Sequence, residues 1–158
     1  MFSVGDKVVY PMHGAGVIEA IEEREVLGET RKYYVMRLPV GNMKVFVPLG
    51  SVGNLGLREV ISQSEVQQVL SVLNTKPTAP PLAWNRRYRA NLEKIKSGDI
   101  LEVAEVVRSL ALRDKEKGLS TGEKKMYENA CQILISELVL AQESEEEQVR
   151  TWLNKILA

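Results

Sequence analysis

The sequence contains a single cysteine, Cys131, and a single histidine, His13, among its 158 residues. A disulfide within the chain is therefore impossible, and a metal site built from histidine and cysteine is nearly excluded by count. No apolar run approaches the roughly 18 residues that a membrane span requires, and the opening MFSVGDKVVYP lacks the basic-then-apolar order of a secretion signal. We expect no cofactor, no metal, no membrane contact, no small-molecule substrate and a reducing, cytoplasmic location.

Net charge is also absent, because 21 Lys and Arg residues balance 21 Asp and Glu residues. Nothing in the overall charge indicates a nucleic acid or a membrane as partner. The balance nevertheless hides a local excess, since residues 84–97 contain one acidic residue, Glu93, and five basic ones: Arg86, Arg87, Arg89, Lys94 and Lys96. A basic patch on a neutral protein indicates a confined electrostatic contact.

Chemistry-bearing groups are equally sparse. His13 lies in the turn-like stretch PMHGAG, and Cys131 lies among apolar residues of an expected helix. No nucleophile–base pair, metal set or phosphate-binding glycine loop accompanies them. The sequence therefore predicts a protein that is not an enzyme.

Short strand-like runs dominate residues 1–60. β-branched and aromatic residues gather in DKVVYP, AGVIEAIEEREV, RKYYVMRL and KVFVP, with glycine, proline and asparagine between them. About five short strands are too few for a large sandwich, whereas closing a small, strongly bent sheet removes its exposed edges. We predict a Tudor- or SH3-like β-barrel over residues 1–60.

Helical patterns replace strand patterns after Gly56. The segment 62–74 begins with a capping box made by Ser62 and Glu65. The segment TKPTAPP, residues 75–81, contains three prolines and is typical of a linker or hinge. Residues 61–81 are thus predicted to be a helix and a proline-rich connection.

Further helices follow with clear start and stop signals. They are expected over 84–97, 99–117 and 120–142, with a last short helix started by Ser144 and Glu147 as a capping box. Asp99 is the expected cap of the second, and Ser120 with Glu123 that of the third. Apolar stripes on these helices predict a compact bundle over residues 82–158, so the whole chain is expected to be α+β.

The basic helix 84–97 allows two interpretations. Tyr88, Leu92 and Ile95 form a narrow apolar seam, and the arginines and lysines on both flanks are expected to remain in water. Trp84 could be a staple that fastens the helix to the core. It could instead be an apolar wedge that enters the DNA minor groove, while the neighbouring cations bind phosphates without reading sequence.

A second basic pair, Lys124 and Lys125, falls in the first turn of an expected helix. Cations there oppose the helix dipole, so two together suggest an external anion. The alternative is that Glu123 and Glu128 compensate them.

Three motifs in order carry a family resemblance: VGDKVVYPMHGAGVIEAIE, WNRRYRANLEKIKSGD, and AEVVRSL with RDKEKGLSTGEKKM. They resemble the CarD/CdnL family of bacterial transcription regulators over residues 1 to about 142. The resemblance implies a Tudor-like domain that binds the RNA polymerase β subunit, followed by a helical domain that contacts promoter DNA at the upstream edge of the bubble. It implies stabilisation of the open promoter complex, notably at ribosomal RNA promoters, without a sequence-specific operator.

The same resemblance implies roles for individual residues. Trp84 matches the wedge, and Arg86, Arg87, Arg89, Lys124 and Lys125 match basic residues that hold DNA. Arg24 and Val26 match positions that face polymerase. Phe46 stands where some relatives carry an arginine, so either the polymerase contact is more apolar here or the partner surface differs. A protein–protein adaptor that binds polymerase without touching DNA is the alternative function.

Overall fold

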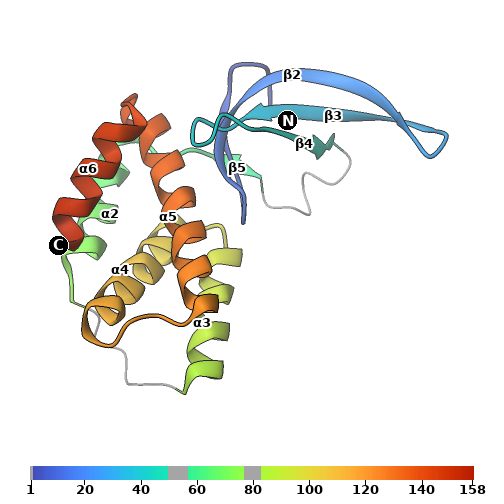
Figure 1. Ribbon diagram of the computed structural model, residues 1–158. Helices are drawn as coiled ribbons and strands as arrows, with labels where there is room; N and C mark the ends of the chain where they lie inside the picture. Colours follow the sequence, from blue (N-terminus) through green and yellow to red (C-terminus); the bar gives the residue numbers. More distant parts are fainter. Residues whose placement is uncertain (1, 50–56, 77–82) are drawn as a thin grey trace.

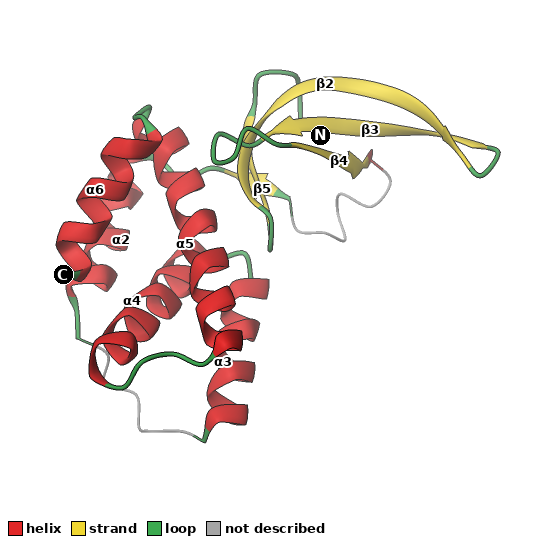
Figure 2. Ribbon diagram, in the orientation of Figure 1, coloured by secondary structure: helices red, strands yellow, loops and turns green. Residues whose placement is uncertain are grey.

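Strands come first and helices follow, which confirms the α+β organisation predicted from the sequence (Figure 2). The computed structural model describes residues 2–49, 57–76 and 83–158 (Figure 1). The strands are β1 (Lys7–Tyr10), β2 (Gly14–Val26), β3 (Glu29–Arg37), β4 (Lys44–Pro48) and β5 (Arg58–Glu59). The helices are α2 (Gln63–Asn74), α3 (Trp84–Lys96), α4 (Ile100–Glu116), α5 (Thr121–Gln142) and α6 (Glu146–Leu157).

The sheet is antiparallel, with strand order β4-β3-β2-β1-β5. β2 bends at an irregularity between Ile18 and Ala20, as expected for a bulge. Its far half pairs only with β3, so these two strands extend past their neighbours as a long hairpin (Figure 1). Within the described residues no ladder joins β4 to β5, and both are edge strands.

One face of the bent sheet encloses a small core. Alternate residues of a strand point to the same face, and the buried members come from all parts of the sheet: Val8, Ile18, Tyr34, Met36, Leu38, Val47 and Leu57. The Tyr34 hydroxyl accepts a hydrogen bond from the backbone N–H of Phe2 at 3.0 Å, so the one polar group of this buried ring is satisfied.

A second core lies among the helices, where the predicted apolar stripes are confirmed. The stripe of α4 is buried (Ile100, Val103, Ala104, Val107, Leu110 and Ala111), as is that of α5 (Met126, Ala130, Ile133, Leu134, Ile135, Leu138 and Val139). Val66, Val69 and Leu73 of α2 belong to the same core. α2, which the sequence groups with the connection 61–81, therefore packs as part of the bundle.

The proline-rich segment differs in position from the hinge that its composition suggests. It links α2 to α3, two helices of the bundle, whereas the chain crosses from sheet to helices between β5 and α2. Reorientation at this segment would not separate the sheet from the helical core. Residues 77–82 themselves lie outside the described part of the chain.

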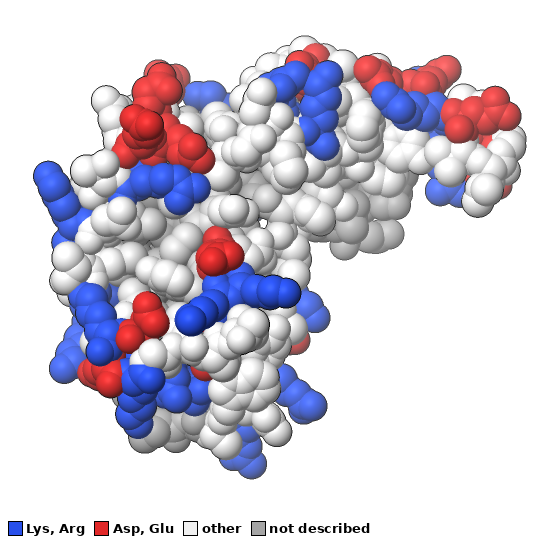
Figure 3. Space-filling view, viewed as in Figure 1, with Lys and Arg blue, Asp and Glu red and all other residues white. Residues whose placement is uncertain are grey.

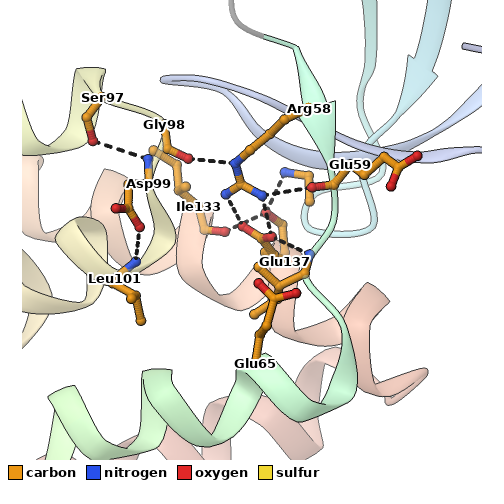
Figure 4. Close-up of polar contacts among 12 residues, drawn as sticks. Arg58, Glu59, Glu65, Ser97, Gly98, Asp99, Leu101, Ile133 and Glu137 are labelled. Atoms are coloured by element: carbon orange, nitrogen blue, oxygen red, sulfur yellow. Dashed lines mark hydrogen bonds and ion pairs between the residues drawn. The ribbon is translucent and has the colours of Figure 1, made fainter.

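Sheet and helices are joined by a partly buried ion pair between Arg58 and Glu137 (Figure 4). Arg58 of β5 donates two hydrogen bonds to the carboxylate of Glu137, at 2.7 and 2.8 Å, and one to the carbonyl oxygen of Gly98 at 2.8 Å. The Glu137 carboxylate also accepts from the backbone N–H of Ile61 at 2.9 Å, and its side chain is fully buried. These bonds tie β5, α5 and the α3–α4 turn to one another.

Two further contacts fasten the sheet to the same helix. The Ser136 hydroxyl accepts a hydrogen bond from the backbone N–H of Ala15 at 2.8 Å, and Lys7 donates to the Leu140 carbonyl near the end of α5 at 3.2 Å. β2 approaches α5 so closely that a Cβ atom on Gly14 would lie 2.8 Å from the Ser136 hydroxyl oxygen. The sheet is thus docked on the C-terminal half of α5.

Candidate functional site

Trp84 begins α3 and lies against the start of α5. Its indole Nε1–H donates a hydrogen bond to the Ser120 hydroxyl at 3.1 Å, and Ser120 is the N-cap of α5. The indole stacks on Tyr88 with ring centroids 5.1 Å apart, and Gly122 lies directly beside both rings. Even so, 44% of Trp84 is exposed. The side chain is held against α5 on one face, as the staple interpretation expects, and its other face is exposed.

Arg87 corrects the expectation that both flanks of α3 stay in water. Its side chain is 18% exposed and donates to the Glu123 carboxylate of α5, with Nε at 2.8 Å and Nη2 at 3.2 Å. Glu123 is buried at 2% exposure, so the pair is internal. Lys94, on the same flank, pairs with Glu105 of α4 at 2.8 Å. Helices α4 and α5 each supply a carboxylate to this flank. The periodicity of α3 alone cannot predict these ion pairs, because their acidic partners come from other helices.

The other flank matches the expectation. Arg86, Arg89 and Lys96 are exposed, and no ion pair links them to a carboxylate in the parts of the chain that the structure describes. The N-cap of α3 is Ala83, which provides no side-chain cap, and the first turn of the helix has no acidic residue. The start of α3 therefore presents the Trp84 indole together with the exposed guanidinium groups of Arg86 and Arg89, which have no carboxylate partner among the described residues.

Lys124 and Lys125 lie in the first turn of α5 and are both exposed. The compensation considered from the sequence is not observed, because Glu123 is directed at Arg87 and Arg113 and is buried. Nor does Glu128 pair with either lysine among the described residues. Because the Trp84–Ser120 bond joins the starts of α3 and α5, this lysine pair and the arginines of α3 belong to the same end of the bundle.

The surface charge follows this division. Figure 3 shows mostly basic side chains around the end of the helical part where α3 begins, whereas the β2–β3 hairpin carries acidic and basic side chains side by side. A surface that contacts phosphates without reading bases requires this kind of local excess. We use the name basic end for Trp84, Arg86, Arg89, Lys124 and Lys125.

The residues expected to face polymerase lie on the sheet. The Arg24 guanidinium of β2 stands 4.2 Å above the ring of Phe46 of β4, a cation–π contact. Val26 follows on the same face of β2, two residues nearer the hairpin tip. Phe46 is 39% and Val26 48% exposed, so the three residues form one accessible, partly apolar surface.

The hairpin tip adds an apolar residue that sequence reasoning missed. Leu27 is completely exposed, and with Gly28 it forms a two-residue turn in which both φ angles are positive, 54° and 81°. A type I′ turn requires such angles and favours Asn-Gly or Gly-Gly. Leucine is unfavourable at this position of the turn. Its presence before Gly28 could therefore have indicated, from the sequence alone, an apolar residue kept for contact with a partner.

The two surfaces lie at different ends of the molecule. The β2–β3 hairpin projects away from the helices, and the start of α3 lies at the end of the bundle far from it (Figure 1). The structure therefore does not bring Arg24, Val26 and Phe46 together with the basic end. One chain presents two separate surfaces, joined through the contacts of Arg58 and Glu137.

Two of the remaining titratable groups, Tyr127 and Cys131, interact with each other within α5. Burial raises the pKa of the Cys131 thiol to about 11 and raises the pKa of the Tyr127 hydroxyl as well. His13 is exposed and stacks on Tyr10. In the described ranges no group of three or more His, Cys, Asp and Glu side chains could hold a metal ion, and no helix is long and apolar enough to cross a membrane.

Comparison with known proteins gives a family for each part of the chain. Residues 2–61 match the CarD-like/TRCF RID domain, and residues 68–154 match the CarD C-terminal domain. The "Putative transcription factor YdeB" of Bacillus subtilis (strain 168) is 43% identical over 152 residues, which cover 96% of this chain and 99% of that protein.

A solved structure also matches the N-terminal part. The solution structure of the 72-residue N-terminal domain of Myxococcus xanthus CarD is 37% identical, and the match covers 37% of this chain and 79% of that one with a TM-score of 0.33. The family inferred from the three sequence motifs is confirmed by the matches to both domains and by the relative that spans nearly the whole chain. This chain therefore belongs to the CarD family, with an RID domain before a CarD C-terminal domain.

Proposed function

We propose that this protein stabilises the open promoter complex by binding the RNA polymerase β subunit through its sheet and promoter DNA through its basic end. Membership of the CarD family supports a transcription regulator, and the family consists of transcription factors, not enzymes. The β subunit, the open complex and ribosomal RNA promoters as main targets are our proposal, and so is contact at the upstream edge of the bubble.

The exposed indole beside cations without ion pairs is the observation that carries the DNA contact. Arg86, Arg89, Lys124 and Lys125 are exposed and have no carboxylate partner among the described residues, so their charge is available for phosphates. The open face of Trp84 is available to lean into a minor groove and unstack a base step. We assign Arg87 a structural role instead of a DNA contact, because its guanidinium group is paired with Glu123.

The sheet supports the polymerase contact. Arg24, Val26, Phe46 and Leu27 form an exposed surface on the projecting hairpin and its neighbouring edge strand. Edge strands can pair with a strand of a partner, while side chains supply selectivity. Phe46 makes this contact more apolar than an arginine would.

Binding through two surfaces explains how a protein of zero net charge can act on DNA. Docking on polymerase would raise the effective concentration of the basic end at the promoter, so the protein need not bind free DNA tightly. A preference of about 1–3 kcal/mol for the open over the closed state would change open-complex occupancy about 5- to 150-fold.

The test is the lifetime of open complexes formed by the cognate polymerase on a ribosomal RNA promoter after a competitor challenge. The native protein is expected to lengthen the lifetime, and Trp84→Ala to lose most of that gain while still binding polymerase. Trp152→Phe is the matched control, because it changes the other tryptophan, in α6. An unchanged lifetime with native protein would contradict the proposal.

Salt dependence separates this function from a protein–protein adaptor. Each phosphate contact contributes about −0.9 to the slope of log K against log salt concentration on duplex DNA. Adding the protein should therefore steepen the salt dependence of promoter binding by polymerase, and Arg86→Ala with Arg89→Ala should reverse part of the change. An adaptor would leave the slope as it is without the protein.

A further inference from the structure

The Trp84 indole is the outer end of a chain of hydrogen bonds that begins in the interior. Arg87 donates to the buried Glu123 carboxylate, whose Oε1 accepts from the Ser120 hydroxyl at 3.4 Å. Ser120 in turn accepts from the Trp84 Nε1–H at 3.1 Å. The chain runs from α3 to α5 and back to α3, so each helix fixes a group on the other.

The direction of this chain is set by Glu123. A carboxylate only accepts hydrogen bonds, so the single hydroxyl hydrogen of Ser120 points toward it. Both lone pairs of Ser120 are then left for donors, and they meet the Trp84 Nε1–H and the backbone N–H of Glu123, at 3.1 and 3.2 Å. The bonding capacity of the Ser120 hydroxyl is fully used, and it presents an acceptor to the indole.

Glu123 is held in the charged form by its surroundings. The hydrogen bonds from Arg87 lower the pKa of its carboxyl group, against the opposing effect of burial, and Arg113 at 3.8 Å adds to the lowering. The acceptor geometry at Ser120 is therefore maintained at neutral pH.

Packing limits the indole from another side. Trp84 lies nearly parallel to Tyr88, with 21° between the ring planes, and a Cβ atom on Gly122 would be 3.7 Å from the Trp84 ring and 3.6 Å from the Tyr88 ring. A stacked ring with its N–H bonded has one orientation, although 44% of the residue is exposed. We expect these contacts to order the indole before any partner binds.

We propose that Ser120 and Glu123 are positioning residues for Trp84, which hold its indole in the orientation that engages DNA. This inference rests on the proposed function, because it concerns how the same tryptophan acts. A side chain ordered in advance avoids the entropy loss of ordering it on binding. Losing that order corresponds to about a 2- to 10-fold loss of the lifetime gain.

The test variant is Ser120→Gly, because glycine is nearly as good as serine at a helix N-cap but has no acceptor for the indole. Ser120→Thr keeps the hydroxyl and should rescue. Ser62→Gly is the matched control, because it removes the capping hydroxyl of α2, which does not contact Trp84. Thermal unfolding of each variant verifies that the fold is retained.

Two readouts are compared in the Trp152→Phe background, where Trp84 is the only tryptophan. Acrylamide quenching and fluorescence anisotropy of the free protein report the order of the indole, and open-complex lifetime reports its action. Ser120→Gly should increase quenching, lower anisotropy and reduce the gain in lifetime about 2- to 10-fold, whereas Ser120→Thr and Ser62→Gly should match the unsubstituted background.

The outcomes separate the two proposals. If Ser120→Gly leaves quenching and lifetime unchanged, or changes the lifetime without changing quenching, Ser120 does not position Trp84. If Trp84→Ala itself retains the full lifetime, the proposed function fails at the tryptophan. The fluorescence of the free protein would in that case still decide whether Ser120 orders the ring.

Discussion

Arg86 and Arg87 are neighbours in sequence with opposite surroundings. The Arg86 side chain is exposed, whereas Arg87 is fixed to a carboxylate that is itself 2% exposed. Removing one partner of a buried pair leaves an uncompensated charge in the interior, which costs far more than losing an exposed side chain. The side of the helix on which an arginine lies therefore decides whether it stabilises the fold, as Arg87 does, or is exposed and available to a partner, as Arg86 is.

This difference gives a prediction for a matched pair of variants. Arg87→Ala should lower the free energy of unfolding by about 3 kcal/mol, and Arg86→Ala should change it by less than about 0.5 kcal/mol. Urea denaturation measures both. Only Arg86→Ala should reduce the salt dependence of promoter binding without affecting stability. Equal stability of the two variants would show that the Arg87–Glu123 pair contributes little.

Cys131 gives a second prediction at this scale. Burial raises the pKa of its thiol to about 11, and only the thiolate reacts with disulfide reagents. At pH 8 the thiolate fraction should be about 0.1%, which slows reaction with Ellman's reagent about 100-fold or more relative to a free cysteine. The rate should keep rising with pH up to about 11 and become normal in denaturant. A plateau of the rate near pH 8.5 would contradict the burial.

Helix starts show what local sequence can and cannot predict. The capping box of Ser62 and Glu65 is confirmed, because both groups lie within one turn. Ser120 caps α5 as expected, but the Glu123 carboxylate is occupied by Arg87 from another helix. Residues 36 positions apart in sequence meet only through tertiary packing, and no local motif encodes that meeting.

The expected cap of the last helix was wrong by one residue. α6 begins at Glu146, with Glu145 as N-cap and Gln148 completing the capping box, instead of Ser144 with Glu147. The reason is the end of α5, where Glu143 adopts φ 52° and the Ser144 N–H bonds back to the Val139 carbonyl at 3.0 Å. Ser144 is therefore used to close one helix and is not available to open the next.

The hairpin tip gives a prediction at the scale of one element. Leu27 has φ 54°, a conformation that costs an ordinary residue about 1–2 kcal/mol and that asparagine tolerates better. Leu27→Asn should raise the unfolding free energy by up to about 1 kcal/mol, measured by urea denaturation. The same variant should weaken binding to the polymerase β subunit at least about 5-fold if Leu27 is an interface residue.

Leu27→Met is the control for that experiment. It keeps an exposed apolar side chain without relieving the backbone, so binding should be retained and stability unchanged. If Leu27→Asn binds polymerase as well as the native protein does, the leucine has no part in docking.

The relative placement of the two surfaces is a property of the whole molecule. Arg58 and Glu137 form a bidentate pair with Glu137 at 0% exposure, and they lie between the sheet and the bundle. The sequence predicted both domains from local patterns, but it gave no signal for this pair because its residues are 79 positions apart. The predicted hinge lies in the proline-rich segment between α2 and α3, whereas the chain passes from the sheet to the bundle between β5 and α2.

The pair leads to a prediction about rigidity. Glu137→Ala should leave Arg58 without its main partner, lower the unfolding free energy by about 3–5 kcal/mol and loosen the sheet on the bundle. Spin labels at Leu27→Cys and Lys115→Cys in a Cys131→Ala background should report one narrow distance distribution, which Glu137→Ala should broaden. Open-complex lifetime should fall although polymerase binding is retained.

Glu143→Gln is the matched control, because Glu143 is 76% exposed and forms an ion pair with Lys7 across the same junction. It should keep the narrow distribution and the lifetime. A narrow distribution in Glu137→Ala would mean that apolar packing and the Ser136 contact suffice to fix the sheet.

Helix α5 contacts both the group of residues around Trp84 and the sheet. Glu123 in its first turn holds the groups around Trp84, and the sheet is held by Ser136, 13 residues later, and by Glu137 next to it. At 1.5 Å per residue that interval is about 20 Å, and each residue adds about 100° of rotation. The helix therefore fixes the distance and the relative rotation between the groups around Trp84 and the docked sheet. A single residue inserted between Glu123 and Ser136 would rotate one attachment by about 100° relative to the other. It would also shift buried residues of α5, such as Ala130 and Ile133, out of the core, so the length of this segment matters to the fold as much as its composition does.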